Sequence, residues 1–365
     1  MKRICHLTSV HPVRDPRILL KECSSLSVKY EVHLVAVSEV PVTYGNVIIH
    51  TVPPAKNHIA RWIFTVGQVY RKAKAVKAAV YHFHDPELIP AAFLLRVQGA
   101  RVVYDVHEDN YTTILQRDYI PGFIKKPAAA ILARAEQFMS TFYHVVLAER
   151  YYKRRFPHGR IIQNFPMQNI IIRGERTFPY TKPAVLYTGS LTRDRGALEY
   201  LRLANSMKHV QFHFIGRCKS SLAEHMLCNA RHNNIHMEKT GEYVSFSAIQ
   251  QCLHMNRWLA GMAIFPQTRH YEQKELTKFY EYMAAGLPVI YSRFPVWEQL
   301  IGGHSAGIAV DPGSVDSMVN AVQYLLENPG AAEGMGSHGK NAVIAHYTWE
   351  HEAEKLFSLY EGLFR

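Results

Sequence analysis

Short apolar runs of strand length alternate with segments of helical spacing along the whole chain, and this alternation is the strongest constraint on its fold. In the first half, strand-like runs occupy residues 4–10, 32–37, 46–52, 80–84 and 101–106, with helical spacing at 19–26 and 88–97. Strands that are apolar on both faces predict a parallel sheet covered by helices on both sides. The first half therefore predicts one doubly wound α/β domain.

The same pattern restarts after a segment that contains Pro166, Pro179 and Pro183, which interrupt regular structure. Strand-like runs follow at 184–187, 210–215, 260–265, 289–291 and 307–310, with a helix expected at 196–207. A chain of 365 residues has the length of about two domains. We therefore predict an α/β protein with two Rossmann-like, doubly wound domains, 1–170 and 171–349, and a last helix at 350–364.

Composition excludes several classes of protein. Hydrophobic residues make up 48% of the chain and charged residues 20%, which excludes a disordered protein. No apolar run approaches the roughly 18–20 residues of a membrane-spanning helix, and residues 1–12 are expected to form a first strand and not a signal peptide. The five scattered cysteines lack a CxxC pair, which argues against a disulfide scaffold or zinc cluster and favours the reducing cytoplasm.

Positive charge is concentrated in the first half. Residues 1–170 hold 23 Lys and Arg against 12 Asp and Glu, a net charge of +11, whereas the remaining residues have a net charge of +1. Such asymmetry indicates a polyanionic partner, either nucleic acid or an anionic membrane, or else a charge that only aids solubility. Segments 61–80 and 123–126 mix large apolar with basic residues, which suits a membrane interface as well as a core helix with a solvated basic face.

Ligands of open α/β sheets bind at the carboxyl ends of the strands, so the residues that follow each strand are candidate site residues. In the first half these are His11, Arg14, Asp15, His84 and His107. His107 could bind substrate or carry a proton near neutral pH, or be a structural histidine. No metal site is expected at the pair of histidines 82 and 84, whose side chains we take to point to opposite faces of their strand.

In the second half, the strand ends carry glycines and basic residues. Gly189 and Ser190 precede Arg193 and Arg195 at the start of a helix, where two arginines could bind a diphosphate or simply be solvated, and Gly216 ends the next strand. A further helix begins near residues 276–278. Glu281, one turn into it, could accept both hydroxyls of a ribose, or be a surface glutamate that adjoins a lysine three residues earlier.

Seven motifs in sequence order resemble family 4 GT-B glycosyltransferases, the retaining enzymes common in the synthesis of bacterial surface polysaccharides. These motifs are Asp15-Pro16-Arg17-Ile18, Tyr104-Asp105-Val106-His107-Glu108, Asn164-Phe165-Pro166, Tyr187-Thr188-Gly189-Ser190 with Arg195-Gly196, the segment from Phe279 to Ile290, the segment from Gly307 to Pro312, and Tyr347-Thr348-Trp349-Glu350. The resemblance implies two Rossmann-like domains that face a cleft, with the nucleotide-sugar bound by the second domain and the last helix, 350–365, packed back on the first.

The resemblance also implies roles for single residues. Arg195 stands at the family's diphosphate-binding lysine, Glu281 at the ribose-binding glutamate of its E-x7-E motif, and His107 at its active-site histidine, so these three form the expected catalytic set. Three positions depart from the family. Gln273 replaces the first glutamate of the motif, with Glu272 or Glu275 able to substitute by a shift of register. Ser190 replaces a basic residue for which Arg193 would serve, and residues 11–14 replace a glycine-rich loop.

The resemblance implies a glycosyltransferase that moves a hexose-type sugar from a nucleoside-diphosphate sugar to a lipid-linked glycan with retention, at the anionic inner leaflet, as a peripheral cytoplasmic protein. No D-x-D motif is present, so we expect no essential metal and no cofactor. The alternatives are a GT-B sugar-nucleotide epimerase and a basic nucleic-acid-binding protein, although the chain contains no compact recognition motif. The expected donor-binding residues are Gly189, Ser190, Arg193, Arg195, Gly216, Gln273, Glu275, Leu276, Thr277, Lys278 and Glu281, and the expected acceptor-side residues are His11, Arg14, Asp15 and His84.

Overall fold

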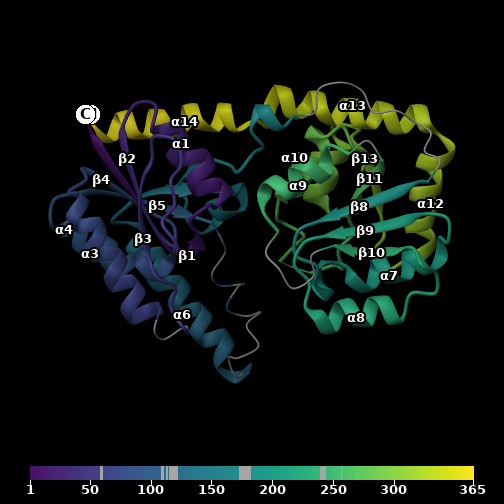
Figure 1. The fold of residues 1–365 in the computed structure, drawn as a ribbon, viewed down its shortest axis with the longest axis horizontal. Coiled ribbons are helices and arrows are strands. Elements are labelled where there is room, and N and C mark those ends of the chain that lie inside the picture. Colours follow the sequence, from purple (N-terminus) through teal and green to yellow (C-terminus); the bar gives the residue numbers. More distant parts are fainter. Residues whose placement is uncertain are drawn as a thin grey trace. The chain divides into compact units, whose positions relative to one another are not determined.

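Two parallel sheets organise the chain, each within its own unit (Figure 1). Contacts in the computed structural model divide the chain into unit 1, Met1–Asn164 with Trp349–Arg365, and unit 2, Phe165–Thr348. The division falls a few residues before the boundary expected at 170, and the last helix belongs to unit 1. The structure describes residues 1–57, 61–107, 111, 114, 122–171, 182–238, 244–255, 257–268 and 270–365.

Unit 1 contains a seven-stranded sheet in the order β3-β2-β1-β4-β5-β6-β7, and all of its strand pairs are parallel. Its strands are β1 (Arg3–Pro12), β2 (Glu31–Val37), β3 (Ile48–Val52), β4 (Val80–Phe83), β5 (Arg101–Val106), β6 (His144–Leu147) and β7 (Arg160–Ile161). The strand order reverses between β1 and β4. In such sheets the ligand site lies at this reversal, outside the carboxyl ends.

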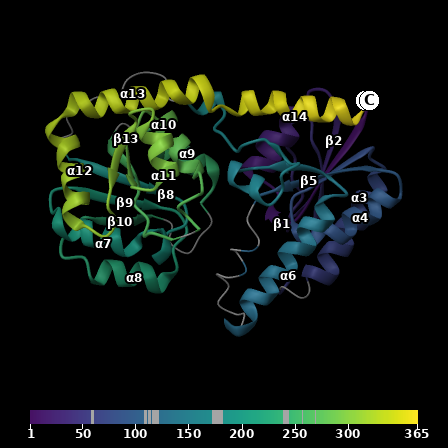
Figure 2. The same cartoon turned by 180° about the vertical axis from the view of Figure 1, so that it is seen from behind.

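Helices cover both faces of this sheet. One face carries α3 (Val66–Val76), α4 (Ile89–Val97) and α6 (Gly122–Ser140), and the opposite face carries a π-helical segment η1 (Pro16–Cys23), α1 (Ser24–Leu26) and α14 (Trp349–Leu363) (Figures 1 and 2). The short segments η2 (Arg61–Thr65), η3 (Pro86–Leu88) and η4 (Arg150–Arg154) complete the unit. Asp15 caps η1, since its Oδ1 accepts the backbone N–H groups of Arg17 and Ile18.

Unit 2 contains a six-stranded parallel sheet in the order β10-β9-β8-β11-β12-β13. Its strands are β8 (Ala184–Thr188), β9 (Gln211–Ile215), β10 (Ile235–Glu238), β11 (Trp258–Ala263), β12 (Val289–Ser292) and β13 (Gly307–Val310). Here the order reverses between β8 and β11. This reversal places the turn after β8 and the segment after β11 at the edge where ligands bind.

The helices of unit 2 also lie on both faces of its sheet. Figure 1 shows α9 and α10 on one face with α13, and α7 and α8 on the other. The helical segments are η5 (Gln168–Ile170), η6 (Arg193–Arg195), α7 (Ala197–Ser206), α8 (Ser220–Cys228), α9 (Phe246–Leu253), α10 (Thr277–Ala284), α11 (Pro295–Trp297), η7 (Glu298–Gly302), α12 (Val315–Glu327) and α13 (Pro329–His346). The doubly wound α/β class predicted for both halves is therefore confirmed.

Candidate functional site

Two glycines bring the loops after β8 and β9 into backbone contact in unit 2. Gly189 has φ +98° and Gly216 has φ +149°. A Cβ atom on Gly216 would lie 2.2 Å from the carbonyl oxygen of Gly189. No other residue type fits this position without moving the backbone, so the glycine allows the two strand ends to form one surface.

Arg195 is oriented by its neighbours at the start of the next helix. Its Nε donates to the Tyr271 hydroxyl at 3.0 Å, and its Nη1 lies 3.5 Å from the carbonyl oxygen of Ser190. Tyr271 in turn donates to Asp194 at 2.9 Å. Arg193, in the same segment, is exposed. The guanidinium group of Arg195 is therefore held in place, whereas that of Arg193 lies at the surface.

Lys278 is the most unusual group of this edge. Its Nζ lies 3.7 Å from the centre of the Tyr187 ring and, among the described residues, has no hydrogen-bond partner. Burial holds the pKa of Lys278 well below its usual range, the charge of Arg195 lowers it further, and Glu281 opposes the shift. A buried ammonium group needs an anion or several acceptors to compensate for lost hydration. The site therefore suits an anionic ligand.

The remaining expected donor residues lie before and within the first turns of α10. Leu276 precedes the helix, Thr277 is its exposed first residue, and Gln273 and Glu281 are partly buried. The carboxylate of Glu275 accepts the Tyr280 hydroxyl at 2.5 Å, and Glu272 accepts the Gln267 amide at 2.7 Å. Both carboxylates that flank Gln273 are thus already engaged within unit 2.

In unit 1, His107 forms a hydrogen bond with a fully buried carboxylate. His107 Nε2 lies 2.6 Å from Asp105 Oδ2, and Arg17 donates to both oxygens of Asp105 at 2.8 Å. Burial opposes ionisation of Asp105, but Arg17 and then His107 outweigh it and hold its pKa well below the usual range. An ionised Asp105 fixes the proton of His107 on Nε2 and leaves Nδ1 as the other reactive atom of the ring.

Three of the four expected acceptor-side residues gather around His107. His84 Nδ1 lies 3.1 Å from His107 Nε2, and the rings of His11 and His107 have centroids 4.9 Å apart. His11 Nδ1 lies 3.4 Å from Asp15 Oδ2. Arg14 is exposed. The motif residue Glu108 lies outside the described residues, so the structure gives no placement for it.

The expectation that His82 and His84 point to opposite faces is wrong. Residues two apart on a strand share a face, and the two rings stack with centroids 4.8 Å apart. Sequence reasoning placed their buried neighbours Arg17 and Asp105 in motifs without giving them a role, and it missed Glu22. A usable indication was present, because charged residues inside otherwise apolar segments are rarely buried without partners.

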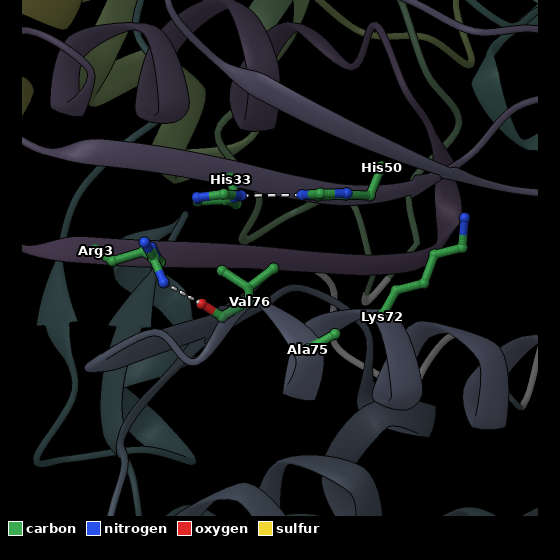
Figure 3. Close-up of a pocket in the computed structure, with 6 residues that line it drawn as sticks. All are labelled: Arg3, His33, His50, Lys72, Ala75 and Val76. Atoms are coloured by element: carbon green, nitrogen blue, oxygen red, sulfur yellow. Dashed lines mark hydrogen bonds between the residues drawn. The ribbon is translucent and has the colours of Figure 1, made fainter.

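A cavity of about 350 Å³ lies elsewhere in unit 1 (Figure 3). Its lining residues are Arg3, His33, His50, Lys72, Ala75 and Val76. Its polar groups are already bonded within the protein. Arg3 donates to the Val76 carbonyl at 2.7 Å, the rings of His33 and His50 are joined at 2.9 Å, and Lys72 donates to the Thr51 carbonyl at 2.7 Å. We assign this cavity no role.

Comparisons with known proteins find similarity to glycosyltransferases. A family model described as "Glycosyl transferase-like" matches residues 195–358. The GDP-mannose-dependent alpha-(1-6)-phosphatidylinositol monomannoside mannosyltransferase of Mycobacterium tuberculosis is 34% identical over 84 residues, which are 23% of this chain and 22% of that protein. The match thus spans about a fifth of the curated relative's length.

Solved structures match over nearly the full length. The sucrose-phosphate synthase from Thermosynechococcus elongatus superposes with a TM-score of 0.77 at 16% identity, covering 100% of this chain and 99% of the other. Anabaena HepE in complex with UDP-glucose superposes with a TM-score of 0.72 at 11% identity, covering 99% and 100%. At these identities the likeness shows the fold. The chain therefore has the fold of GT-B glycosyltransferases, and its residues 195–358 resemble a glycosyltransferase family.

Proposed function

We propose that the chain transfers a hexose-type sugar from a nucleoside-diphosphate sugar to a lipid-linked glycan acceptor, with retention, in the synthesis of a bacterial surface polysaccharide. The observation that carries the proposal is the buried ammonium group of Lys278, which has no hydrogen-bond partner among the described residues and lies at the ligand-binding edge of unit 2. A nucleoside diphosphate supplies the negative charge that this group requires.

The ligands of similar proteins support this choice of donor. HepE was solved with UDP and with UDP-glucose, and the mycobacterial relative is named for its use of GDP-mannose. Cleavage of the sugar–phosphate bond leaves negative charge on the departing diphosphate. Arg195 and Lys278, together with the first backbone N–H groups of α10, would stabilise that charge. His107 would contact the transferred sugar or the acceptor, with its Nε2–H bonded to Asp105.

A panel of nucleotide-sugars tests the donor assignment by thermal stabilisation. A ligand at 100 times its dissociation constant adds about 2.7 kcal/mol to stability. We expect one base–sugar combination to raise Tm and to be consumed only when an acceptor glycan is added, and NMR of the product to show a retained anomeric configuration. Consumption without any acceptor would favour the epimerase, and no stabilisation by any nucleoside diphosphate would contradict the proposal.

A lipid-linked acceptor requires a surface that can face a membrane, and exposed apolar residues of unit 1 support such a surface there. None of the described helices combines the length and apolar composition needed to cross a bilayer. However, Trp62 and Phe64 are 54% and 64% exposed, so they are not buried in the core of unit 1. On α6, Ile124, Ile131 and Phe138 repeat every seven residues on one exposed face. Lys125 and Lys126 follow Ile124 directly on α6. Lys72 and Lys74 lie on α3, the helix that follows Trp62 and Phe64 in sequence.

We propose that the surface formed by these apolar residues of η2 and α6 and by the lysines of α3 and α6 docks on anionic lipid. Each basic residue near such a surface contributes about 1 kcal/mol, and the attraction decays within a Debye length. A triple change to Glu at Lys72, Lys74 and Lys77 should reduce binding to anionic vesicles but leave turnover on a soluble acceptor unchanged. Trp62→Ser with Phe64→Ser should weaken the salt-resistant part of the binding. A control of the same charge change uses exposed residues of unit 2, namely Lys182, Lys208 and Arg231. Equal, salt-insensitive binding of the wild type to neutral and anionic vesicles would contradict electrostatic docking.

A further inference from the structure

A cluster of titratable side chains lies wholly inside unit 1 and reaches the site around His107 through His84. His6 comes from β1, Glu22 from η1, and His82 from β4, which His84 follows directly. All four side chains are 0–2% exposed. Glu22, His82, His84 and Asp105 each offer a metal-ligating atom, and these atoms lie within 4.8 Å of one another. The fold thus brings four candidate ligands together from three segments that are distant in sequence.

One oxygen of Glu22 is surrounded by imidazole nitrogens that do not bind it. Glu22 Oε2 lies 3.8 Å from His6 Nδ1, 4.0 Å from His82 Nδ1 and 4.0 Å from His84 Nε2. Among the described residues it has no hydrogen-bond partner, because each of these distances exceeds hydrogen-bond range. The other oxygen, Oε1, faces Arg17 Nε at 3.1 Å.

These separations are those of atoms that share one ion. Two ligands bound at about 2.1 Å lie about 3.0 Å apart at a right angle and can never be more than about 4.2 Å apart. His6 Nδ1 and His84 Nε2 are 3.0 Å apart, and the three distances from Glu22 are 3.8 to 4.0 Å. Tetrahedral ligands at this bond length lie about 3.4 Å apart, so an ion would draw Glu22 toward the histidines. It would also replace the hydrogen bonds that join His6 Nδ1 to His84 Nε2 and His82 Nδ1 to the Tyr360 hydroxyl.

The outer nitrogens of His84 and His6 are held as they are in metal sites, whereas His82 Nε2 has no hydrogen-bond partner among the described residues. His84 turns Nε2 toward Glu22 while its Nδ1 lies 3.2 Å from the Asp105 carboxylate. His6 turns Nδ1 the same way while its Nε2 contacts the Tyr360 hydroxyl at 3.3 Å. A carboxylate or hydroxyl on the far nitrogen fixes the tautomer and ring orientation of a ligating histidine. Asp105 is better placed for this role than for ligation, since Arg17 occupies both of its oxygens.

The balance of the buried charges in this cluster also indicates a bound cation. With neutral imidazoles, the cluster contains the carboxylates of Glu22 and Asp105 against the single positive charge of Arg17. One negative charge is left over inside the core, where an uncompensated charge is strongly unfavourable. A cation or a proton must balance it.

We propose that Glu22, His6, His82 and His84 bind one divalent transition-metal ion, of which Zn²⁺ fits three nitrogen ligands and one oxygen ligand best. The site is closed to solvent, so the ion is structural. It ties β1, η1 and β4 together and fixes the ring of His84 that contacts Asp105. This inference is independent of the donor assignment in unit 2, and it revises the expectation that the chain holds no metal.

Elemental analysis of the untagged full-length protein tests the proposal. We expect close to one zinc or other transition-metal ion per chain, and a lower Tm after unfolding and refolding in chelator that is restored by Zn²⁺. Growth or refolding with Co²⁺ should produce the visible d–d absorption of a nitrogen-coordinated ion. These measurements use the wild type, so they do not depend on whether a variant folds.

Variants separate an ion from a proton on Glu22. Glu22→Gln keeps the shape of a protonated carboxyl but removes a ligand charge, and it should reduce the bound metal and the Tm together. His50→Asn is the matched control, because His50 belongs to a stacked pair with His33 outside the cluster, and its metal content should equal that of the wild type. A wild type that stays metal-free after exposure to Zn²⁺ and Co²⁺, with a Glu22→Gln variant at least as stable, would assign the balancing charge to a proton and overturn the proposal.

Discussion

Replacement of Lys278 by methionine should stabilise unit 2 and weaken nucleotide binding at the same time. The Lys278 ammonium group is buried over the Tyr187 ring without a hydrogen-bond partner among the described residues, so methionine keeps its length and removes an uncompensated polar group. If the group exists to receive a diphosphate, the free protein is less stable because of it. A purely structural lysine would show the opposite effect on stability.

The magnitudes follow from burial and from the charge of the ligand. Replacing buried ion pairs by apolar residues of similar volume stabilises proteins by up to roughly 1–4 kcal/mol, and we expect a gain of this order for Lys278→Met. Each kcal/mol raises Tm by about 2–4 °C in a unit of this size. A hydrogen bond to a charged group contributes about 1.5–3 kcal/mol, so the affinity for a nucleoside diphosphate should fall by roughly 10- to 150-fold.

Proton uptake provides an independent measurement. Burial lowers the pKa of Lys278, whereas a bound diphosphate favours the charged form of the amine and should raise that pKa again. Calorimetric titrations of UDP and GDP in buffers of different ionisation enthalpy should therefore show proton uptake by the wild type but less uptake by Lys278→Met. Lys208→Met changes an exposed lysine of the same unit and should alter none of these quantities. A Lys278→Met variant that is less stable but binds the diphosphate normally would refute the reasoning.

Other residues give sharper or simpler tests. Glu281→Ala should lower kcat/KM for the donor by an amount that corresponds to about 1–3 kcal/mol in a folded variant. Arg195→Ala should weaken nucleoside diphosphate binding. A donor-bound structure with Arg195 more than about 6 Å from the phosphates would exclude Arg195 from diphosphate binding. Gly216→Ala forces a Cβ to 2.2 Å from a backbone oxygen and should lower both Tm and donor affinity, whereas Gly99→Ala, also at positive φ but with nothing within 4 Å, should cost only about 1 kcal/mol. Burial, and then the charge of the neighbouring His236, lowers the pKa of His213 from 6.5 to about 4. Between these pH values the unfolded chain binds more protons than the folded chain, so stability should fall as the pH decreases. The fall should be less steep in His213→Gln.

The sheets could be predicted because most of their strands are apolar on both faces, but β6, β7 and β10 were not predicted. Strand β7 has two residues, too few for any periodicity to be visible, and polar residues alternate with apolar ones in β10. Length alone is not the reason, since β4, β12 and β13 have four residues each and were predicted. The segment 80–84 was predicted one residue too long, because β4 ends at Phe83 and His84 belongs to the polar residues that follow it.

The expected donor-binding residues of unit 2 could be proposed from the sequence because each belongs to a short local motif. Gly189, Arg195 and Lys278 each occupy a turn or a helix start that can be recognised within a few residues. The cluster in unit 1 is different, since the Tyr360 hydroxyl that contacts His82 Nδ1 at 2.8 Å comes from the other end of the chain. No local pattern connects those two residues, and only the strand order of the sheet brings β1 and β4 together.

Two buried charged groups are incompletely satisfied within the protein. The Nζ atom of Lys278 in unit 2 has no hydrogen-bond partner among the described residues, and Glu22 in unit 1 pairs with Arg17 through Oε1 while its Oε2 has no such partner. Each departs from local rules in a way that costs the free chain stability, and such departures are expected where a ligand restores the balance. Their signs are opposite, so the ligands must be opposite too. The lysine at a strand-end surface calls for an anion that arrives and leaves, whereas the glutamate enclosed by three imidazoles calls for a cation that stays with the fold.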